Sequence, residues 1–322
     1  GATGYIGTHM LLSLMDRGDD VVAFATNGEL PAALAAQVPL EIVAVNDADT
    51  LGARFTEHNV KGIIHFTGDG TVPSSLIHPL REYEQTLIAT LTMLRAATQA
   101  RCEHIVFSST ASVYGVPERM PIREETPLNS ISPFGAAMAM AERLVTDICR
   151  PACISTAILR YFNAAGADPR LRAGETGHPK HLIKAAAQIA TGILDEKLKI
   201  YGDDYDTPDG TAIRDYIHVS DMAEAHAVAL DHLVRGGDPV ILNCGYGEGV
   251  SVRDVIAAVQ RVAGVELDTR VTSRRPGDPP ILIADTAAIR SVLGWSPRYD
   301  DLEMIVRTAI DWEKKDGGLA PQ

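Results

Sequence analysis

The chain has 322 residues, of which 46% are hydrophobic and 22% charged, so it can bury a large core and is about two average domains long. No apolar run approaches the roughly 18–20 residues of a membrane span, and we expect no membrane segment. The 29 Lys and Arg residues against 42 Asp and Glu give a formal charge of -13, which disfavours binding to nucleic acid. A small anionic ligand stays compatible with this charge, because a pocket can be locally positive.

The first half of the chain alternates short β-rich runs with longer helical stretches. The predicted strands are residues 20–25, 40–45, 62–66, 104–108 and 155–160. The predicted helices are residues 9–16, 51–58, 82–98 and 136–148. This alternation predicts βαβ units and a parallel sheet covered on both faces, with the apolar run 104–107 as a central strand.

After residue 160 the pattern changes. Residues 166–180 are rich in Gly, Pro and charge and predict a loop that leaves the first domain. The helices predicted beyond it are residues 182–193, 219–234, 252–263, 286–293 and 302–315. We therefore predict an α/β protein with a doubly wound, Rossmann-type parallel sheet in residues 1–165 and a smaller α/β lobe in residues 166–322, some of whose segments return to the first domain.

Four cysteines, at positions 102, 149, 153 and 244, are too few for a disulfide scaffold in a chain of this length. No Cys or His cluster has metal-ligand spacing, so we expect no metal site. The interpretation is of reduced, mostly buried thiols in a cytoplasmic protein. No signal peptide is visible, but the chain starts at Gly1 without an initiator Met.

A glycine-rich segment opens the chain, with Gly1, Gly4 and Gly7 around Tyr5 and Ile6. Glycines at this spacing ahead of a helix let the backbone approach a pyrophosphate and direct the helix dipole at it. The alternative is a tight turn without a ligand. The strand that should precede Gly1 is not in the chain, so it lies upstream or is absent.

Two further features bear on a ligand. The strand at 20–25 runs into Ala25, Thr26 and Asn27, so it lacks the terminal acid that holds the ribose of NAD in such folds. The central strand runs into hydroxyl-rich residues 108–115, which include Thr110. Hydroxyls at the carboxyl end of a parallel strand lie where ligands bind, although a plain Ser/Thr-rich turn is an equal alternative.

Six segments carry a pattern of high specificity, at residues 4–9, 108–115, 159–167, 201–219, 274–278 and 294–295. Over essentially its whole length the chain resembles the extended short-chain dehydrogenase/reductase superfamily, and within it the UDP-galactose/UDP-glucose 4-epimerases. The resemblance implies NAD as cofactor, held at Gly1, Gly4, Tyr5, Ile6 and Gly7, and a UDP-hexose in the cleft against the second lobe. It also implies a homodimer in which two helices, residues 82–98 and 136–148, form a four-helix bundle.

In that family a Tyr takes the proton of the sugar 4-hydroxyl while NAD takes the hydride, and the flat 4-keto sugar rotates before it is reduced on its other face. A Lys four residues later lowers the pKa of the Tyr, and a Ser or Thr, here Thr110, assists. This chain has Phe134 and Met138 at the two positions, and Ala137 between them. Phe has no titratable proton and Met no charge, so the ordinary reaction should fall to a trace.

Other positions on the cofactor side also depart from the family pattern. Asn46 lies in the segment that meets the adenine in the family. Gly70 stands where the family has a Lys that reaches the cofactor, and Thr86 where it has an Asn ahead of the next helix. Each of these three alignments is good to about one residue. Together with Ala25 they put the retention of NAD in question.

The nucleotide-sugar side keeps the pattern. By resemblance Asn163 meets the diphosphate or sugar, Leu182 approaches the uracil, Arg214 clamps the diphosphate, and Arg275 with Asp278 binds phosphate and ribose. Two arginines suit this task because a guanidinium binds phosphate through two parallel N–H groups.

Some residues have simpler interpretations. For Arg214 the alternative is a structural salt bridge with Asp215 or Asp221. His181 reads as a surface or pocket-lining imidazole, and Tyr114 and Tyr161 as packed side chains rather than substitute bases.

Three hypotheses follow. The favoured one is a UDP-sugar-binding homologue of the epimerases with weak or no activity. The second is a working NAD-dependent 4-epimerase, either altered by design at positions 134 and 138 or using Thr110 with water. The third is a structural interaction protein that uses its helices 82–98 and 136–148 for assembly.

Overall fold

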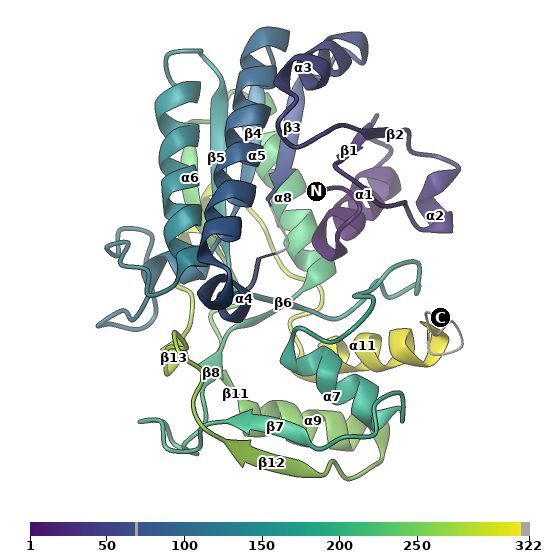
Figure 1. Cartoon of the computed structure of the whole chain (residues 1–322), viewed down its shortest axis with the longest axis vertical. Coiled ribbons are helices and arrows are strands. Elements are labelled where there is room, and N and C mark those ends of the chain that lie inside the picture. Colours follow the sequence, from purple (N-terminus) through teal and green to yellow (C-terminus); the bar gives the residue numbers. More distant parts are fainter. Residues whose placement is uncertain (68–69, 317–322) are drawn as a thin grey trace.

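The computed structural model describes residues 1–67 and 70–316. The chain folds into a sheet-centred upper body and a smaller lower lobe (Figure 1). The elements of the first half are α1 (Tyr5–Arg17), β1 (Ala23–Ala25), α2 (Ala32–Ala35), β2 (Leu40–Ile42), α3 (Ala48–Glu57), β3 (Gly62–Phe66), α4 (Val72–Ile77), α5 (Pro79–Ala100), β4 (His104–Thr110), the 3₁₀ turn η1 (Ala111–Tyr114), α6 (Pro133–Cys149), β5 (Ser155–Tyr161) and β6 (Asn163–Ala165). Those of the second half are α7 (Leu182–Ala190), β7 (Leu198–Tyr201), β8 (Ile213–Arg214), β9 (Tyr216–His218), α8 (Val219–Val234), β10 (Val240–Cys244), β11 (Val250–Ser251), α9 (Val252–Ala263), β12 (Thr269–Thr272), β13 (Ile281–Leu282), α10 (Ala287–Leu293) and α11 (Leu302–Asp316).

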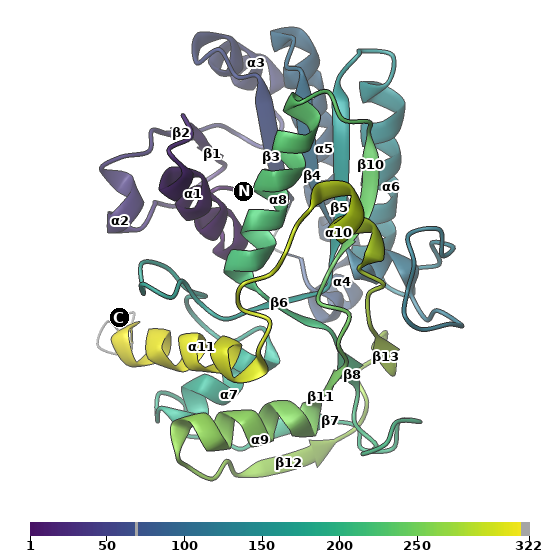
Figure 2. The ribbon, with the colours of Figure 1, turned by 180° about the vertical axis from the view of Figure 1, so that it is seen from behind.

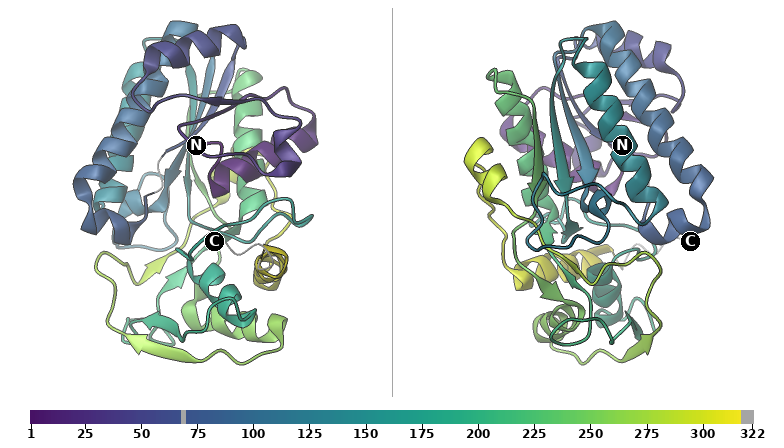
Figure 3. Two further views of the ribbon diagram at one scale, coloured as in Figure 1. Left: turned by 45° about the vertical axis from the view of Figure 1, so that its right-hand side comes forward. Right: turned by 90° about the vertical axis from the view of Figure 1, so that its left-hand side faces the viewer.

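The central sheet has the strand order β10-β5-β4-β3, and every neighbouring pair in it is parallel. Alternate residues of β4 point to opposite faces, as strand geometry requires. Phe107 packs into the apolar cluster under α5 and α6, whereas Val106 packs into the cluster that α8 covers. The right-hand view of Figure 3 shows the sheet nearly edge-on between these helices. The predicted fold class and the central place of the 104–107 strand are confirmed.

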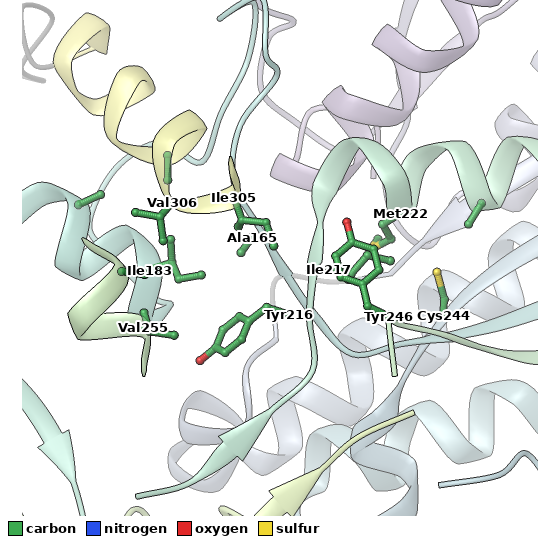
Figure 4. Packing of buried hydrophobic residues seen from close by; sticks show 14 of the residues in the cluster. Ala165, Ile183, Tyr216, Ile217, Met222, Cys244, Tyr246, Val255, Ile305 and Val306 are labelled. Atoms are coloured by element: carbon green, nitrogen blue, oxygen red, sulfur yellow. The ribbon is translucent and has the colours of Figure 1, made fainter. Parts of the chain in front are cut away.

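The segments after residue 166 do not all stay in the second lobe. Helix α8 packs against β4, β5 and α1, and β10 pairs with β5 along the edge of the first sheet, as the view from behind shows (Figure 2). The lower lobe holds α7, α9, α11 and the parallel pair β7–β12. One continuous apolar cluster runs from Met222 and Cys244, beside the sheet, to Val255 and Val306 in that lobe (Figure 4).

Local signals explain several element ends. Helix α1 stops at Gly18, which adopts the left-handed region at φ 80° that favours glycine. Asp47 begins α3 by accepting a hydrogen bond from the backbone N–H of Thr50, and a capping box of Ser251 and Asp254 begins α9.

The N-terminal strands are shorter than predicted. Strands β1 and β2 have three residues each and form a separate parallel pair. In the described part of the chain no strand lies between β1 and β3 to join the two sheets by hydrogen bonds. Gly1 lies between the ends of these two strands: its amino group donates to the carbonyl of Phe24 at 3.2 Å, and a Cβ at this position would collide with Phe66.

Of the helices in the described ranges, none is both long and apolar enough to cross a bilayer.

Candidate functional site

The glycine turn lies at the carboxyl end of the sheet, where ligands bind in open α/β folds. Helix α1 follows Gly4 directly, and no side chain caps its first N–H groups. A Cβ at Gly7 would collide with the carbonyl of Gly1, so the tight turn requires glycine there. Nothing closer than 3.5 Å meets a Cβ at Gly4, which leaves the backbone accessible. The free N–H groups and the helix dipole therefore favour an anionic group above this turn.

The side chains of Tyr5 and Ile6 point away from such a ligand. The Tyr5 hydroxyl donates to the carbonyl of Gly166 at 2.6 Å, and Ile6 packs against the large apolar cluster. Burial raises the pKa of Tyr5 well above its ordinary value. Arg172 reinforces the contact between α1 and this loop, because it binds Asp16 at 2.7 Å and Asp168 at 2.8 Å. Tyr5 and Ile6 can therefore contact a cofactor only through their backbone.

The hydroxyl groups at the end of β4 are mostly used inside the protein. Ser108 bonds His226 at 3.0 Å, and burial lowers the pKa of that imidazole to about 4, so it is neutral. Ser109 donates to Glu142 at 2.5 Å. Thr110 is 5% exposed, accepts from the N–H of Ser112 at 3.2 Å and donates to its hydroxyl at 3.3 Å. Thr110 is therefore poorly placed to serve, with water, as a substitute base.

A buried ionic network fixes the neighbouring tyrosine. Arg160 binds Glu142 through two nitrogens, with its closest contact at 2.7 Å, and donates to the hydroxyl of Tyr114 at 2.9 Å. That hydroxyl donates to Asn243 at 2.7 Å. Burial raises the pKa of Tyr114, and also that of Tyr161, to about 12, the opposite of what a base at neutral pH needs.

The start of α6 holds the two altered positions. Ser132 begins this helix by accepting from the N–H of Gly135 at 3.2 Å, and a Cβ at Gly135 would collide with the backbone of Ser112, so α6 lies directly on η1. Phe134 and Met138 join the apolar cluster on this face of the sheet. Met138 is 2% exposed, and its sulfur accepts a hydrogen bond from Thr67 at 3.2 Å. Neither side chain can transfer a proton or carry a charge.

The remaining cofactor-side positions have local roles. Asp47, next to Asn46, caps α3, and Thr86 donates to Glu82 at 3.1 Å. A Cβ at Gly70 would collide with the carboxylate of Glu82. Gly68 and Asp69, in the same expected cofactor segment, lie outside the described residues.

On the substrate side, Arg214 and Asp278 form an ion pair. Arg214 is 8% exposed and also donates to the carbonyl of Ile213 at 2.8 Å. The alternative salt bridges with Asp215 or Asp221 are wrong, because both carboxylates are committed elsewhere. Asp221, for example, accepts from the Tyr246 hydroxyl at 2.6 Å.

Asp215 positions Arg214. Its buried carboxylate accepts from the N–H groups of Tyr246, Gly247 and Ala284 at 2.8–3.2 Å, and its carbonyl accepts from the N–H of Asn163 at 2.9 Å. Burial raises its pKa to about 6 in spite of these donors. The end of β8 is thereby fixed to β6 and to two loops.

The other substrate-side residues surround this centre. Strands β7 and β12 are parallel and end together, and the guanidinium of Arg275, just after β12, lies 3.7 Å from the ring centre of Tyr201 at the end of β7. Leu182 begins α7 and packs against the large apolar cluster. His181 is half exposed and binds Glu175 at 2.9 Å, on the rim of a small cavity. The roles assigned to these residues remain predictions.

Sequence reasoning missed three features of the site: the carboxylate of Glu82, the ring of Tyr201 beneath Arg275, and the clamp made by Asp215. Only the first left a sequence signal, since Glu82 precedes Thr86 by one helical turn. All four cysteines are free, three are buried and Cys153 is exposed. Within the described ranges no three His, Cys, Asp or Glu side chains lie close enough together to hold a metal ion.

The parallel sheet, the glycine turn at its carboxyl end and the arginine–carboxylate pair in a second lobe define a two-lobed α/β protein of the dinucleotide-binding class. The chain belongs to the NAD dependent epimerase/dehydratase family, which it matches over residues 1–245.

Its relatives in sequence and in structure agree. It is similar to the UDP-glucose 4-epimerase of Azospirillum brasilense, with 46% identity over 98% of this chain and 90% of that protein. A structure of UDP-glucose 4-epimerase from Stenotrophomonas maltophila, with bound NAD and formylated UDP-arabinopyranose, has a TM-score of 0.93 at 32% identity and covers 99% of this chain and 98% of that one. The Bifidobacterium longum enzyme in complex with NAD+ and UDP has a TM-score of 0.91 at 33% identity, with 98% and 97% covered.

Proposed function

We propose that this protein binds a UDP-hexose in the cleft between the sheet and the lower lobe and epimerises it at most at a trace rate. The observation that carries the proposal is the contrast between two corners of one site. At the start of α6, Phe134 and Met138 are packed into apolar surroundings. At the end of β8, Arg214 is held by a buried clamp beside Asp278.

Five residues on the substrate side have a defined part in that proposal. The guanidinium of Arg214 supplies N–H donors to the diphosphate, Arg275 and Asp278 bind phosphate and ribose, Asn163 meets the diphosphate or sugar, and Leu182 approaches the uracil. NAD supplies hydride transfer when it is bound, and the glycine turn fits its pyrophosphate. Neither side chain at positions 134 and 138 can accept the proton of the sugar hydroxyl, so the bound sugar is converted at most at a trace rate.

Calorimetric titration with UDP-glucose tests the binding half of this proposal. We expect a 1:1 complex of micromolar affinity, with UDP alone binding more weakly because the hexose contacts are lost. Absence of heat at millimolar UDP-glucose would contradict the proposal and favour a purely structural role for the fold.

We also propose a homodimer through α5 and α6, and a cytoplasmic location to which the four free cysteines lend support. These two helices pack side by side and leave Ile88, Leu91 and Met140 exposed by 39%, 45% and 50%. We expect a dimer by light scattering at micromolar concentration, and Met140→Glu to shift it toward monomer because a charge would be buried. Met304→Glu, at a residue exposed by 39% on α11, is the matched control. A monomeric wild type would contradict the assembly.

A further inference from the structure

Glu82 is a buried carboxylate in the cofactor half of the molecule. It lies in the first turns of α5 and is 5% exposed. Its carboxylate accepts a hydrogen bond from the hydroxyl of Thr86 at 3.1 Å, and among the described residues it forms no ion pair. Burial raises its pKa. Such a group destabilises its surroundings when ionised, because one neutral hydrogen bond does not replace the hydration that burial removes.

This carboxylate lies against the loop that leaves the carboxyl end of β3. That loop starts beside the glycine turn, since Gly1 is in contact with the backbone of Phe66. Thr67 then binds the sulfur of Met138, and Gly70 has no room for a Cβ because the oxygens of Glu82 occupy that space. The loop that starts beside the glycine turn is therefore backed by the carboxylate of Glu82. The exposed guanidinium of the neighbouring Arg81 offsets its charge only in part, because burial outweighs this attraction and the pKa of Glu82 is raised overall.

We propose that the Glu82 carboxylate opposes the binding of NAD, so that this protein takes up the dinucleotide far more weakly than the glycine turn alone would allow. The physical cause is repulsion between a carboxylate in a region of low dielectric and the two negative charges of a pyrophosphate. The inference rests on the proposed function only in taking the cleft to hold a UDP-hexose, and it concerns the other half of the site.

Calorimetric titration with NAD of the wild type and of Glu82→Gln tests the proposal. Gln preserves the shape and can still accept from Thr86, but it removes the charge. We expect Glu82→Gln to bind NAD at least about tenfold more tightly, equivalent to about 1.4 kcal/mol. Glu84→Gln is the matched control, because Glu84 is exposed on the same helix and its neutralisation should leave the affinity unchanged.

Two further measurements separate the possible results. We expect Glu82→Gln to raise the melting temperature in the absence of any nucleotide, since it removes a buried charge whose desolvation Thr86 and Arg81 do not fully offset. UDP-glucose affinity, measured on the same samples, should equal that of the wild type; its loss in the wild type would refute the proposed function and not this inference. An NAD affinity of Glu82→Gln equal to the wild type, undetectable in both, or weaker, as expected if the carboxylate pairs with the nicotinamide cation, would overturn the inference.

Discussion

Assayed with UDP-galactose and NAD, the purified protein will form UDP-glucose roughly 10²–10⁴-fold more slowly than the Azospirillum brasilense relative measured in parallel. The reason is the loss of the group that takes the sugar proton, since a positioned acid or base contributes a factor of that size. Neither neighbouring hydroxyl can take over the proton transfer that Phe134 and Met138 cannot perform. The Thr110 hydroxyl donates its hydrogen bond to Ser112, and burial raises the pKa of Tyr114 to about 12. A rate equal to that of the relative would contradict the account of an inactive homologue.

The double variant Phe134→Tyr/Met138→Lys distinguishes the two enzymatic hypotheses. Were these two positions the only defect, restoring them would raise the rate by orders of magnitude. We expect a gain of less than about tenfold, because Gly70, Glu82 and Thr86 leave the cofactor side altered. Unchanged UDP-glucose affinity would show that the variant is folded. Recovery to the rate of the relative would mean that the cofactor groove is intact.

Arg214→Ala will lower the affinity for UDP-glucose by about 30-fold or more, since truncating one member of a buried, hydrogen-bonded charge pair costs roughly 2–5 kcal/mol. Arg214 is 8% exposed, and its position is set by the backbone that Asp215 holds. Lysine keeps the charge but not the planar guanidinium, so the UDP-glucose affinity of Arg214→Lys should lie between that of the wild type and that of Arg214→Ala. The measurement is calorimetry on proteins of matched melting temperature.

Arg261→Ala is the control for that series. Arg261 is exposed on α9, where it pairs with Glu303 at 2.8 Å, and an exposed pair of this kind contributes little to stability. We expect no change in UDP-glucose affinity. Equal losses in the Arg214 and Arg261 variants would mean that overall charge, rather than a diphosphate clamp, governs binding.

The sheet and its helices were predictable because their signals are local. The apolar run 104–107 and the alternation of short strands with helices suffice for a parallel sheet, and helices α8 and α9 match their predicted bounds. The short helices α2 and α4 escaped prediction because four to six residues carry no periodicity.

The site was predictable only in part. The glycine spacing and the losses at positions 134 and 138 are visible in the sequence. The ion pair of Arg214 with Asp278 and the stacking of Arg275 on Tyr201 are not, because they join residues more than 60 positions apart through the folding of the lower lobe. The alternative of a salt bridge between Arg214 and Asp215 or Asp221 is wrong because it considers only neighbours in sequence, whereas the partner, Asp278, is distant in the chain.

The clamp around Asp215 and the helix that carries Phe134 belong to separate pieces of the architecture. The clamp consists of backbone N–H groups that donate to the Asp215 carboxylate, whereas the helix with Phe134 packs on one face of the central sheet. Substitutions in α6 that abolish proton transfer therefore need not lower the affinity for a nucleotide. A scaffold divided in this way lets descendants of an enzyme lose turnover and keep recognition, which is the starting point for a sensor or a carrier of the same metabolite.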